Sequence, residues 1–288
     1  MKLIIRLLIL CTISTIYSYH GYAADIPYFT PKNTTDAVTF DFTYAGADAS
    51  GYYISVKPHI PLGTKTYWKT AGFGGIDPVF DFSNSTNMKS YSVLWGVPEK
   101  HTTSGIINYI LPQNKNILIR FVPENSGLPI NIKGVFDYGY CDTQCKAGQK
   151  NIDMTISASD IPALTPAELQ KIIDNEPSDT AFKEQNIKIF EFQSQKSDNN
   201  YVISFYIEGL EHLKTDDLFY TLDTSHELIE PTVQKIRHNI YSVVLDFGAL
   251  KTIPKKYQMI IVPDTMNKPI LINYDISFKD NNSPYTPD

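Results

Sequence analysis

Alternation of apolar and polar residues dominates this chain. Val38, Phe40, Phe42 and Tyr44 alternate with polar positions in one segment. Because successive side chains of a β-strand point to opposite faces, this period of two predicts strands with one buried face. The period recurs at Ile130, Ile132, Phe136 and Tyr138; at Ile152, Met154 and Ile156; at Tyr201, Ile203, Phe205 and Ile207; at Tyr241, Val243, Leu245 and Phe247; and at Ile270, Ile272, Tyr274, Ile276 and Phe278. Gly134 interrupts the second of these series, which is typical of a β-bulge.

One segment departs from the period of two. Thr165 suits a helix N-cap, Pro166 suits the first helical position, and Glu168 completes a capping box. These residues predict a short helix over 166–175, inside a linker that spans 161–178.

Strands on both sides of this helix predict an all-β protein. Short alternating strands separated by polar turns are typical of β-sandwiches. We therefore expect one β-sandwich domain over 25–160 and a second over 179–280. The final residues, 281–288, are rich in Asn, Pro and Asp, and we expect them to be disordered.

The N-terminus has the pattern of a secretory signal. Lys2 and Arg6 give a positive start, and an apolar run follows over 3–16. This run is shorter than the roughly 20 apolar residues that cross a bilayer, so a cleaved signal over 1–24 is favoured over an anchor. Cleavage is expected after Ala23 or Ala24. The mature protein is then a soluble, exported chain with no membrane span.

Composition narrows the range of functions. The chain of 288 residues is 42% hydrophobic and contains 19 tyrosines, which favours β structure with substantial cores. About 265 residues remain after cleavage, a length that fits two domains. The net charge of −6 argues against a nucleic-acid surface and against a patch for anionic membranes.

The cysteines give the strongest candidate chemistry. Cys11 lies in the predicted signal, so the mature chain retains only Cys141 and Cys145, at the connection between two predicted neighbouring strands. A structural disulfide is one interpretation, since exported proteins commonly carry inert bridges. A bridge over so short a loop adds only about 2 kcal/mol in the loop-closure treatment. Spacing alone therefore leaves a stabilising bridge and a reactive site open.

Neighbouring charges distinguish the two cysteines. Asp142 disfavours a thiolate at Cys141, while Lys146 favours one at Cys145. If one thiol attacks a partner, charge alone selects Cys145.

The sequence predicts no metal site and no cofactor. The histidines His59, His101, His212, His226 and His238 are scattered without ligand spacing. Copper(I) on the two thiols is a further hypothesis, but no methionine ligands lie nearby. The Gly72–Gly75 segment indicates a flexible loop and not a phosphate cradle, because no helix is predicted after it.

Four segments resemble the DsbD-like N-terminal domains, the periplasmic part of thiol:disulfide interchange proteins. K-T-Y-W-K-T-A-G over 65–72 is similar to the family's W-K-T-Y-W-R-x-x-G, and P-V-F-D-F-S-N-S over 78–85 is similar to P-x-F-D-[WF]-S-G-S. V-L-W-G-V-P-E-K over 93–100 resembles V-L-W-P-A-P-E-R, and F-D-Y-G-Y-C-D-T-Q-C over 136–145 resembles L-D-Y-x-x-C-x-x-x-C. With the helix and the second β domain, the whole arrangement is similar to the ScsB-like branch.

The resemblance implies an immunoglobulin-like fold for both sandwich domains and a periplasmic thiol–disulfide exchange activity, a protein-disulfide reductase component. A membrane-embedded thiol reductase would reduce the cysteine pair, which would then reduce a thioredoxin-fold protein or a cytochrome c biogenesis factor. By the same resemblance, Cys145 forms the mixed disulfide with partners and Cys141 resolves it.

The chain also departs from the family. It carries neither the membrane domain nor the thioredoxin domain of the full-length reductases, so we expect a separate protein as electron donor. Gly96 and Asn84 replace the usual proline and glycine. The Gly72–Gly75 loop is a candidate for the family's cap loop only through its place in the motif order. The alternative function is a non-enzymatic binding or assembly module with an inert disulfide.

Overall fold

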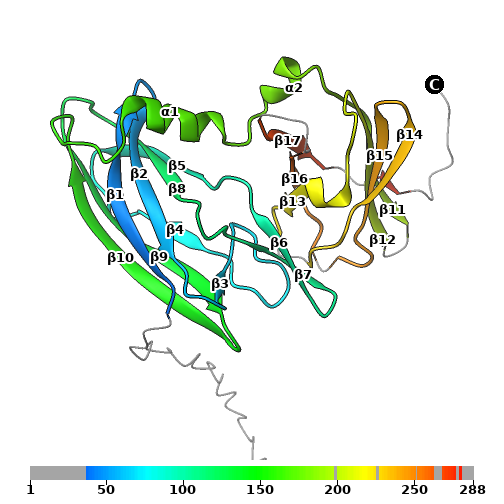
Figure 1. Cartoon of the computed structure of the whole chain (residues 1–288), viewed down its shortest axis with the longest axis horizontal. Helices are drawn as coiled ribbons and strands as arrows, with labels where there is room; N and C mark the ends of the chain where they lie inside the picture. Colours follow the sequence, from blue (N-terminus) through cyan, green and yellow to red (C-terminus); the bar gives the residue numbers. More distant parts are fainter. Residues whose placement is uncertain are drawn as a thin grey trace, which may run out of the picture. The chain divides into compact units, whose positions relative to one another are not determined.

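The predicted strands form and pair into antiparallel sheets. The computed structural model describes residues 37–197, 200–224, 227–250, 252–262, 268–276 and 279–280 (Figure 1). Its first ten strands are β1 Thr39–Asp48, β2 Gly51–His59, β3 Lys65–Thr66, β4 Val79–Asp81, β5 Met88–Leu94, β6 Glu99–Thr103, β7 Ile106–Ile110, β8 Ile117–Pro123, β9 Ile130–Cys141 and β10 Cys145–Ile156. We call this part of the chain the first sandwich.

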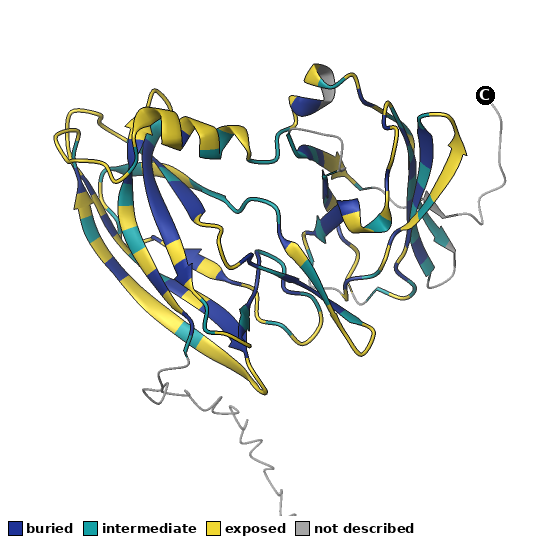
Figure 2. Cartoon of the chain, in the orientation of Figure 1, coloured by how far each residue is buried: buried dark blue, intermediate teal, exposed yellow. Residues whose placement is uncertain are grey.

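The first sandwich contains two sheets and a hairpin. One sheet has the strand order β1-β2-β8-β5, and the other has the order β10-β9-β3 with β4 also paired to β9. Strands β6 and β7 form the hairpin. Apolar side chains from the facing sheets meet in the core, where the ring of Phe40 from β1 lies against the ring of Phe136 from β9 with their centroids 4.8 Å apart. Figure 2 shows the resulting bands of buried and exposed residues along the strands.

The predicted helix is confirmed as α1 Pro166–Asp174, and it is followed by the short α2 Ala181–Glu184. The backbone N–H of Glu168 donates to Thr165 Oγ1, and the N–H of Thr165 donates to the Glu168 carboxylate, as a capping box requires. Leu169 is the buried residue of the helix and packs with Ala45, Tyr53 and Leu118. The helix is therefore anchored on the outer side of the β1–β2–β8 sheet.

The second half of the chain is again built of strands. These are β11 Lys188–Ser197, β12 Asn200–Glu208, β13 Leu218–Leu222, β14 Thr232–Arg237, β15 Ile240–Asp246, β16 Lys256–Ile261, β17 Ile270–Asp275 and β18 Lys279–Asp280, with the 3₁₀ turn η1 Thr215–Asp217 before β13. They form sheets of order β14-β15-β12-β11-β18 and β13-β16-β17. We call this part the second sandwich. The prediction of an all-β sandwich fold is confirmed.

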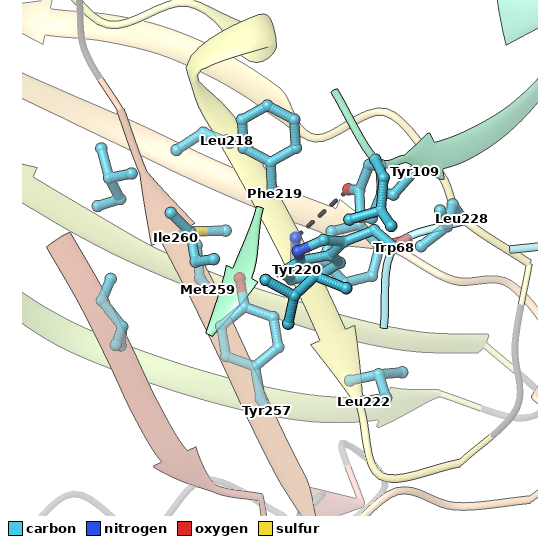
Figure 3. Close-up of a cluster of buried hydrophobic side chains, with 14 of the residues drawn as sticks. Trp68, Tyr109, Leu218, Phe219, Tyr220, Leu222, Leu228, Tyr257, Met259 and Ile260 are labelled. Carbon is cyan, nitrogen blue, oxygen red and sulfur yellow. Dashed lines mark hydrogen bonds between the residues drawn. The ribbon is translucent and has the colours of Figure 1, made fainter. Parts of the chain in front are cut away.

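Aromatic and aliphatic side chains of the two sandwiches share one buried cluster. Figure 3 shows Trp68 and Tyr109 from the first sandwich beside Phe219 and Tyr220 from the second. The backbone N–H of Tyr220 donates to the Tyr109 hydroxyl at 3.3 Å. The described residues all belong to one compact unit, and domain boundaries at 160 and 179 stay predictions.

Two predictions from the sequence are wrong, a bulge at Gly134 and a buried position for Tyr274. No bulge occurs at Gly134, because β9 and β10 pair without a register shift from Ile130 to Cys141. A Cβ at Gly134 would lie 2.4 Å from the carbonyl oxygen of Asp81, so glycine permits a close approach of strands there. Tyr274 does not join the core: it is partly exposed, and its ring stacks on Phe192 with centroids 3.7 Å apart.

Some of the predictions concern the two ends of the chain, which the structure does not describe. The predicted signal sequence 1–24, with Cys11, and the C-terminal residues 281–288 lie outside the described residues, as does Phe278. Within the described part of the chain, no helix has the length and apolar character needed to cross a membrane.

Candidate functional site

The structure brings the two predicted site cysteines together at the tip of the β9–β10 hairpin. Cys141 ends β9, Cys145 begins β10, and the two are direct partners in the strand register. Their Cα atoms lie 4.1 Å apart, and their sulfurs form a disulfide. The loop between them is held by the Asp142 side chain, whose Oδ1 accepts the N–H of Gln144 at 2.8 Å.

The two sulfurs have different surroundings. Cys141 is 3% exposed, whereas Cys145 belongs to the exposed residues at the hairpin tip. Tyr67, Ala71 and Ile110 pack around Cys141. Cys145 is therefore the more accessible residue of the pair.

Tyr67 is the side chain that joins both sulfurs. Its hydroxyl oxygen lies 2.7 Å from Cys141 Sγ and 3.5 Å from Cys145 Sγ. Burial raises the pKa of Tyr67 above its ordinary value, so the phenol keeps its proton at neutral pH and can donate to sulfur. Tyr67 lies in a family-like segment, but its contact with the cysteines cannot be predicted from local patterns because 74 positions separate it from Cys141.

The loop over 71–77 covers the outer face of the hairpin beside Tyr67. Asp77 Oδ1 accepts the N–H of Ala71 at 2.6 Å, and the Asn108 side chain donates to the carbonyl of Ala71 at 2.9 Å. Ile76 lies against Gly139, where an added Cβ would approach the Cβ of Ile76 to 2.5 Å. The Gly72–Gly75 segment therefore belongs to a loop next to the disulfide, secured by side-chain bonds.

Charges next to the disulfide largely cancel. Lys146 Nζ lies 2.9 Å from Asp142 Oδ2. This hydrogen bond from Lys146, followed by the one from the Gln144 N–H, lowers the pKa of Asp142 to about 2. Because the ammonium is paired with a carboxylate, its influence on the Cys145 thiol is smaller than the sequence implied. Exposure, and not charge, now distinguishes Cys145 from Cys141.

The family-like segments have structural roles besides the thiol site. Trp68 is 1% exposed, and its indole N–H donates to the carbonyl of Trp95 at 3.2 Å. Lys100 Nζ lies 2.7 Å from the carbonyl of Thr215 and 3.1 Å from Glu230 Oε2. The contacts of Lys100 attach the first sandwich to the second.

Lys69 follows Trp68 and is largely buried. Its ammonium donates to the side-chain oxygen of Gln258 and lies 4.6 Å from the centroid of the Trp68 ring. Burial lowers the pKa of Lys69 to about 8, against the opposing effect of Glu176. Burial also raises the pKa of Glu176, which accepts the N–H of Gly96 at 2.8 Å.

Within the described residues, no three His, Cys, Asp or Glu side chains lie close enough together to hold a metal ion. The site therefore consists of two sulfurs, one phenol and a paired Asp142–Lys146. Two cysteines so placed can form and break a disulfide, because exchange needs only a thiolate that attacks a disulfide sulfur.

Fold and site together define an all-β, immunoglobulin-like sandwich protein with a disulfide at a hairpin tip. Among solved structures, the protein is similar to the N-terminal periplasmic domain of ScsB from Proteus mirabilis. The two share 18% identity at a TM-score of 0.60, over 85% of this chain and 96% of that one. The resemblance to DsbD-like N-terminal domains is thereby confirmed at the level of the fold.

The remaining comparisons, with titin, with protein-family models and with curated protein sequences, give no further information on the fold or the site. A structure of tandem immunoglobulin domains of titin matches over 85% of this chain and 98% of the titin chain. The sequence identity is 10% and the TM-score is 0.22, which is too low to support any inference. No protein-family model matches the chain, and no curated protein sequence matches it.

Proposed function

We propose that this protein is a thiol–disulfide exchange protein in which Cys141 and Cys145 carry two electrons between partners. The observation that carries the proposal is the asymmetry of the pair. Exposed Cys145 is accessible to attack, while buried Cys141 has a phenol donor 2.7 Å from its sulfur. A bridge whose two sulfurs are equally buried would offer no entry to a partner.

Reduction of the pair begins at Cys145. A thiolate of the donor attacks Cys145 Sγ, a donor–Cys145 bond forms, and the Cys141–Cys145 bond breaks. Cys141 leaves as a thiolate and accepts a hydrogen bond from Tyr67. A second donor thiolate then attacks the donor sulfur of the mixed disulfide and releases Cys145. The donor is oxidised to a disulfide, and the pair gains two electrons.

Delivery to the acceptor reverses these steps. The Cys145 thiolate attacks one sulfur of the acceptor disulfide, and the other acceptor sulfur leaves as a thiolate. Cys141 then attacks Cys145 Sγ, which re-forms the bridge and releases the reduced acceptor. Cys145 is the partner-binding cysteine and Cys141 the resolving one, in agreement with their exposures.

The compartment and the partners belong to the same proposal. The signal-like N-terminus supports export, and a structural neighbour is a periplasmic domain by its own description. The donor is a membrane-embedded thiol reductase. The acceptor is a periplasmic thioredoxin-fold protein, including those of cytochrome c biogenesis.

Trapping tests this proposal. With Cys141→Ser, the mixed disulfide on Cys145 cannot resolve, so an acceptor should accumulate as a covalent complex that reducing agent releases. Cys145→Ser serves as the matched control and should trap far less. If neither variant forms a mixed disulfide with any exported thioredoxin-fold protein, the proposal fails.

The burial of Cys141 also favours a second function, a binding or assembly module with an inert disulfide. An inert bridge requires shielding from reductants, and Tyr67, Ala71 and Ile110 supply it on one side. This function predicts that both serine variants keep their binding partners and that neither traps one covalently.

A further inference from the structure

Strand β10 is an open edge that begins at the exposed cysteine. The sheet has the order β10-β9-β3, so β10 pairs with β9 on one side and with no described strand on the other. Figure 1 shows β10 at the margin of the first sandwich. The first seven residues of β10, Cys145 to Asn151, are all exposed except Gly148, which is half-buried. Figure 2 shows the same exposed stretch.

The register shows which backbone groups face this edge. The N–H of Asp142 donates to the carbonyl of Gln144, so the next pair, Cys141 and Cys145, is a non-hydrogen-bonded pair of the antiparallel ladder. Their Cα separation of 4.1 Å agrees with this assignment. The N–H and C=O of Cys145 therefore point away from β9. By the same alternation, those of Ala147 and Gln149 also face the open edge.

On the opposite side of the hairpin, the outer edge of β9 is already paired with another strand. There the outward-facing backbone of Cys141 is opposite Lys65 of β3. Cys141 thus has a strand on its free side, whereas Cys145 has none among the described residues.

We infer that the open edge of β10 is the docking site for a second class of acceptor, an exported protein that adds an extended, cysteine-bearing segment as a further strand beside Cys145. This inference rests on the proposed function and adds a class of acceptor to it. Main-chain hydrogen bonds give such strand addition its affinity, largely independent of the partner's side chains. One edge can therefore serve several acceptors.

The side chains along the edge suit this role. Ala147 and Gly148 leave room beside Cys145, and the pairing of β9 with β10 runs without a bulge over the full strand. Lys146 and Lys150 place charge along the same strand, which discourages two copies of this chain from pairing edge to edge.

Geometry allows the covalent step in the paired state. A residue opposite Cys145 in a hydrogen-bonded antiparallel pair has its Cα about 5.5 Å away. Disulfides span Cα separations of about 4.4–6.8 Å. The Cys145 thiolate can thus attack the sulfur of a cysteine held at that position, while the sulfur previously bonded to it leaves as a thiolate.

Proline can test the edge with little effect on the fold. Ala147→Pro removes one outward N–H, and proline is tolerated in edge strands where the N–H faces solvent. Ala147→Val is the matched control, because it changes the side chain and keeps the N–H. Both are made with Cys11→Ser and Cys141→Ser in the full chain, so that Cys145 is the only thiol.

The probe is a short peptide of Thr and Val residues with one central cysteine activated as its 5-thio-2-nitrobenzoate disulfide. The reference probe is the same mixed disulfide of single cysteine, which cannot form a strand. We expect the peptide to react at least about fivefold faster than the reference, since a net main-chain hydrogen bond is worth about 1 kcal/mol. Ala147→Pro should remove most of this advantage, and Ala147→Val should keep it.

A second measurement guards against misfolding of the proline variant. The same peptide with methylated main-chain nitrogens should lose its advantage on the protein that retains Ala147. Equal rates for peptide and reference, or an advantage that survives N-methylation, overturn the docking inference and leave the exchange function standing. No reaction of Cys145 with either probe overturns both.

Discussion

The Tyr67 hydroxyl lies 2.7 Å from the sulfur of Cys141, at the buried end of the disulfide. A phenol so placed stabilises the thiolate that Cys141 becomes when the bridge opens, because a charged acceptor strengthens the hydrogen bond. In the proposed exchange reaction, Tyr67 is thus a positioning group for the leaving sulfur.

Tyr67→Phe should raise the pKa of the Cys141 thiol by about one unit, since a hydrogen bond to a charged group is worth about 1.5–3 kcal/mol and water replaces part of it. The measurement is the pH dependence of iodoacetamide alkylation in a Cys11→Ser, Cys145→Ser background. Tyr91→Phe is the control, because it removes a 2.9 Å bond to the carbonyl of Phe80. Equal shifts in both variants, or none with Tyr67→Phe, would contradict the role of Tyr67.

Asp142→Asn should make Cys145 more reactive at neutral pH. The carboxylate is charged there, because its pKa is about 2, and it neutralises Lys146. Removing it frees the ammonium to stabilise the Cys145 thiolate, so the pKa of that thiol should fall. Lys146→Met should raise the same pKa. Both shifts should shrink in high salt, since the groups are near the surface. Alkylation of Cys145 in a Cys11→Ser, Cys141→Ser background measures both.

The disulfide should contribute little to stability. Its loop is short, so the double variant Cys141→Ala, Cys145→Ala should lower the free energy of unfolding by about 2 kcal/mol or less. Phe136→Ala, which removes a fully buried ring of the same strand, should cost about 3–5 kcal/mol. Urea denaturation compares the two. A loss from the double cysteine variant as large as that from Phe136→Ala would favour a structural bridge.

Lys69 should destabilise the folded protein below pH 8. Its folded pKa of about 8 lies below the value of about 10.4 in an unfolded chain. Between these values the unfolded state binds more protons, so stability from this group rises with pH. Lys69→Met should therefore be more stable than the natural protein at pH 7, by on the order of 3 kcal/mol at most, and the difference should shrink as pH rises above 8.

Unfolding measured from pH 6.5 to 9.5 tests this expectation about Lys69. Lys89→Met provides the control, since it removes a lysine whose side chain is exposed. A difference between Lys69→Met and the natural protein that does not depend on pH would contradict a buried, displaced ammonium.

Local sequence rules predicted the elements but not the surroundings of the site. The capping box at Thr165 and Glu168 specifies a helix start within four residues, and the alternation along Tyr201–Ile207 specifies a buried strand face. Both depend on neighbours in the chain. Tyr67 meets Cys141 only because β3 pairs with β9, and no local pattern encodes that pairing.

The structure differs from the sequence-based expectation at Gly134 and at Lys146 as well, because contacts with other residues of the fold decide both. Gly134 appeared to be a bulge because a missing side chain interrupts the alternation, yet Asp81 and Phe82 of another segment fill the space. The pairing of Lys146 with Asp142 follows from the hairpin turn, which brings both side chains to one end. The sequence could show each charge beside its cysteine but not that the two charges neutralise each other.

The reduction potential of the Cys141–Cys145 pair tests the central claim most directly. The natural disulfide, in a Cys11→Ser chain, is equilibrated with dithiothreitol buffers of known potential, and the fraction of free thiols is counted by alkylation and mass measurement. An exchange pair should be reduced at a potential above about −300 mV, within reach of cellular thiol donors. A potential below about −300 mV would contradict the exchange function and identify the bridge as an inert structural disulfide.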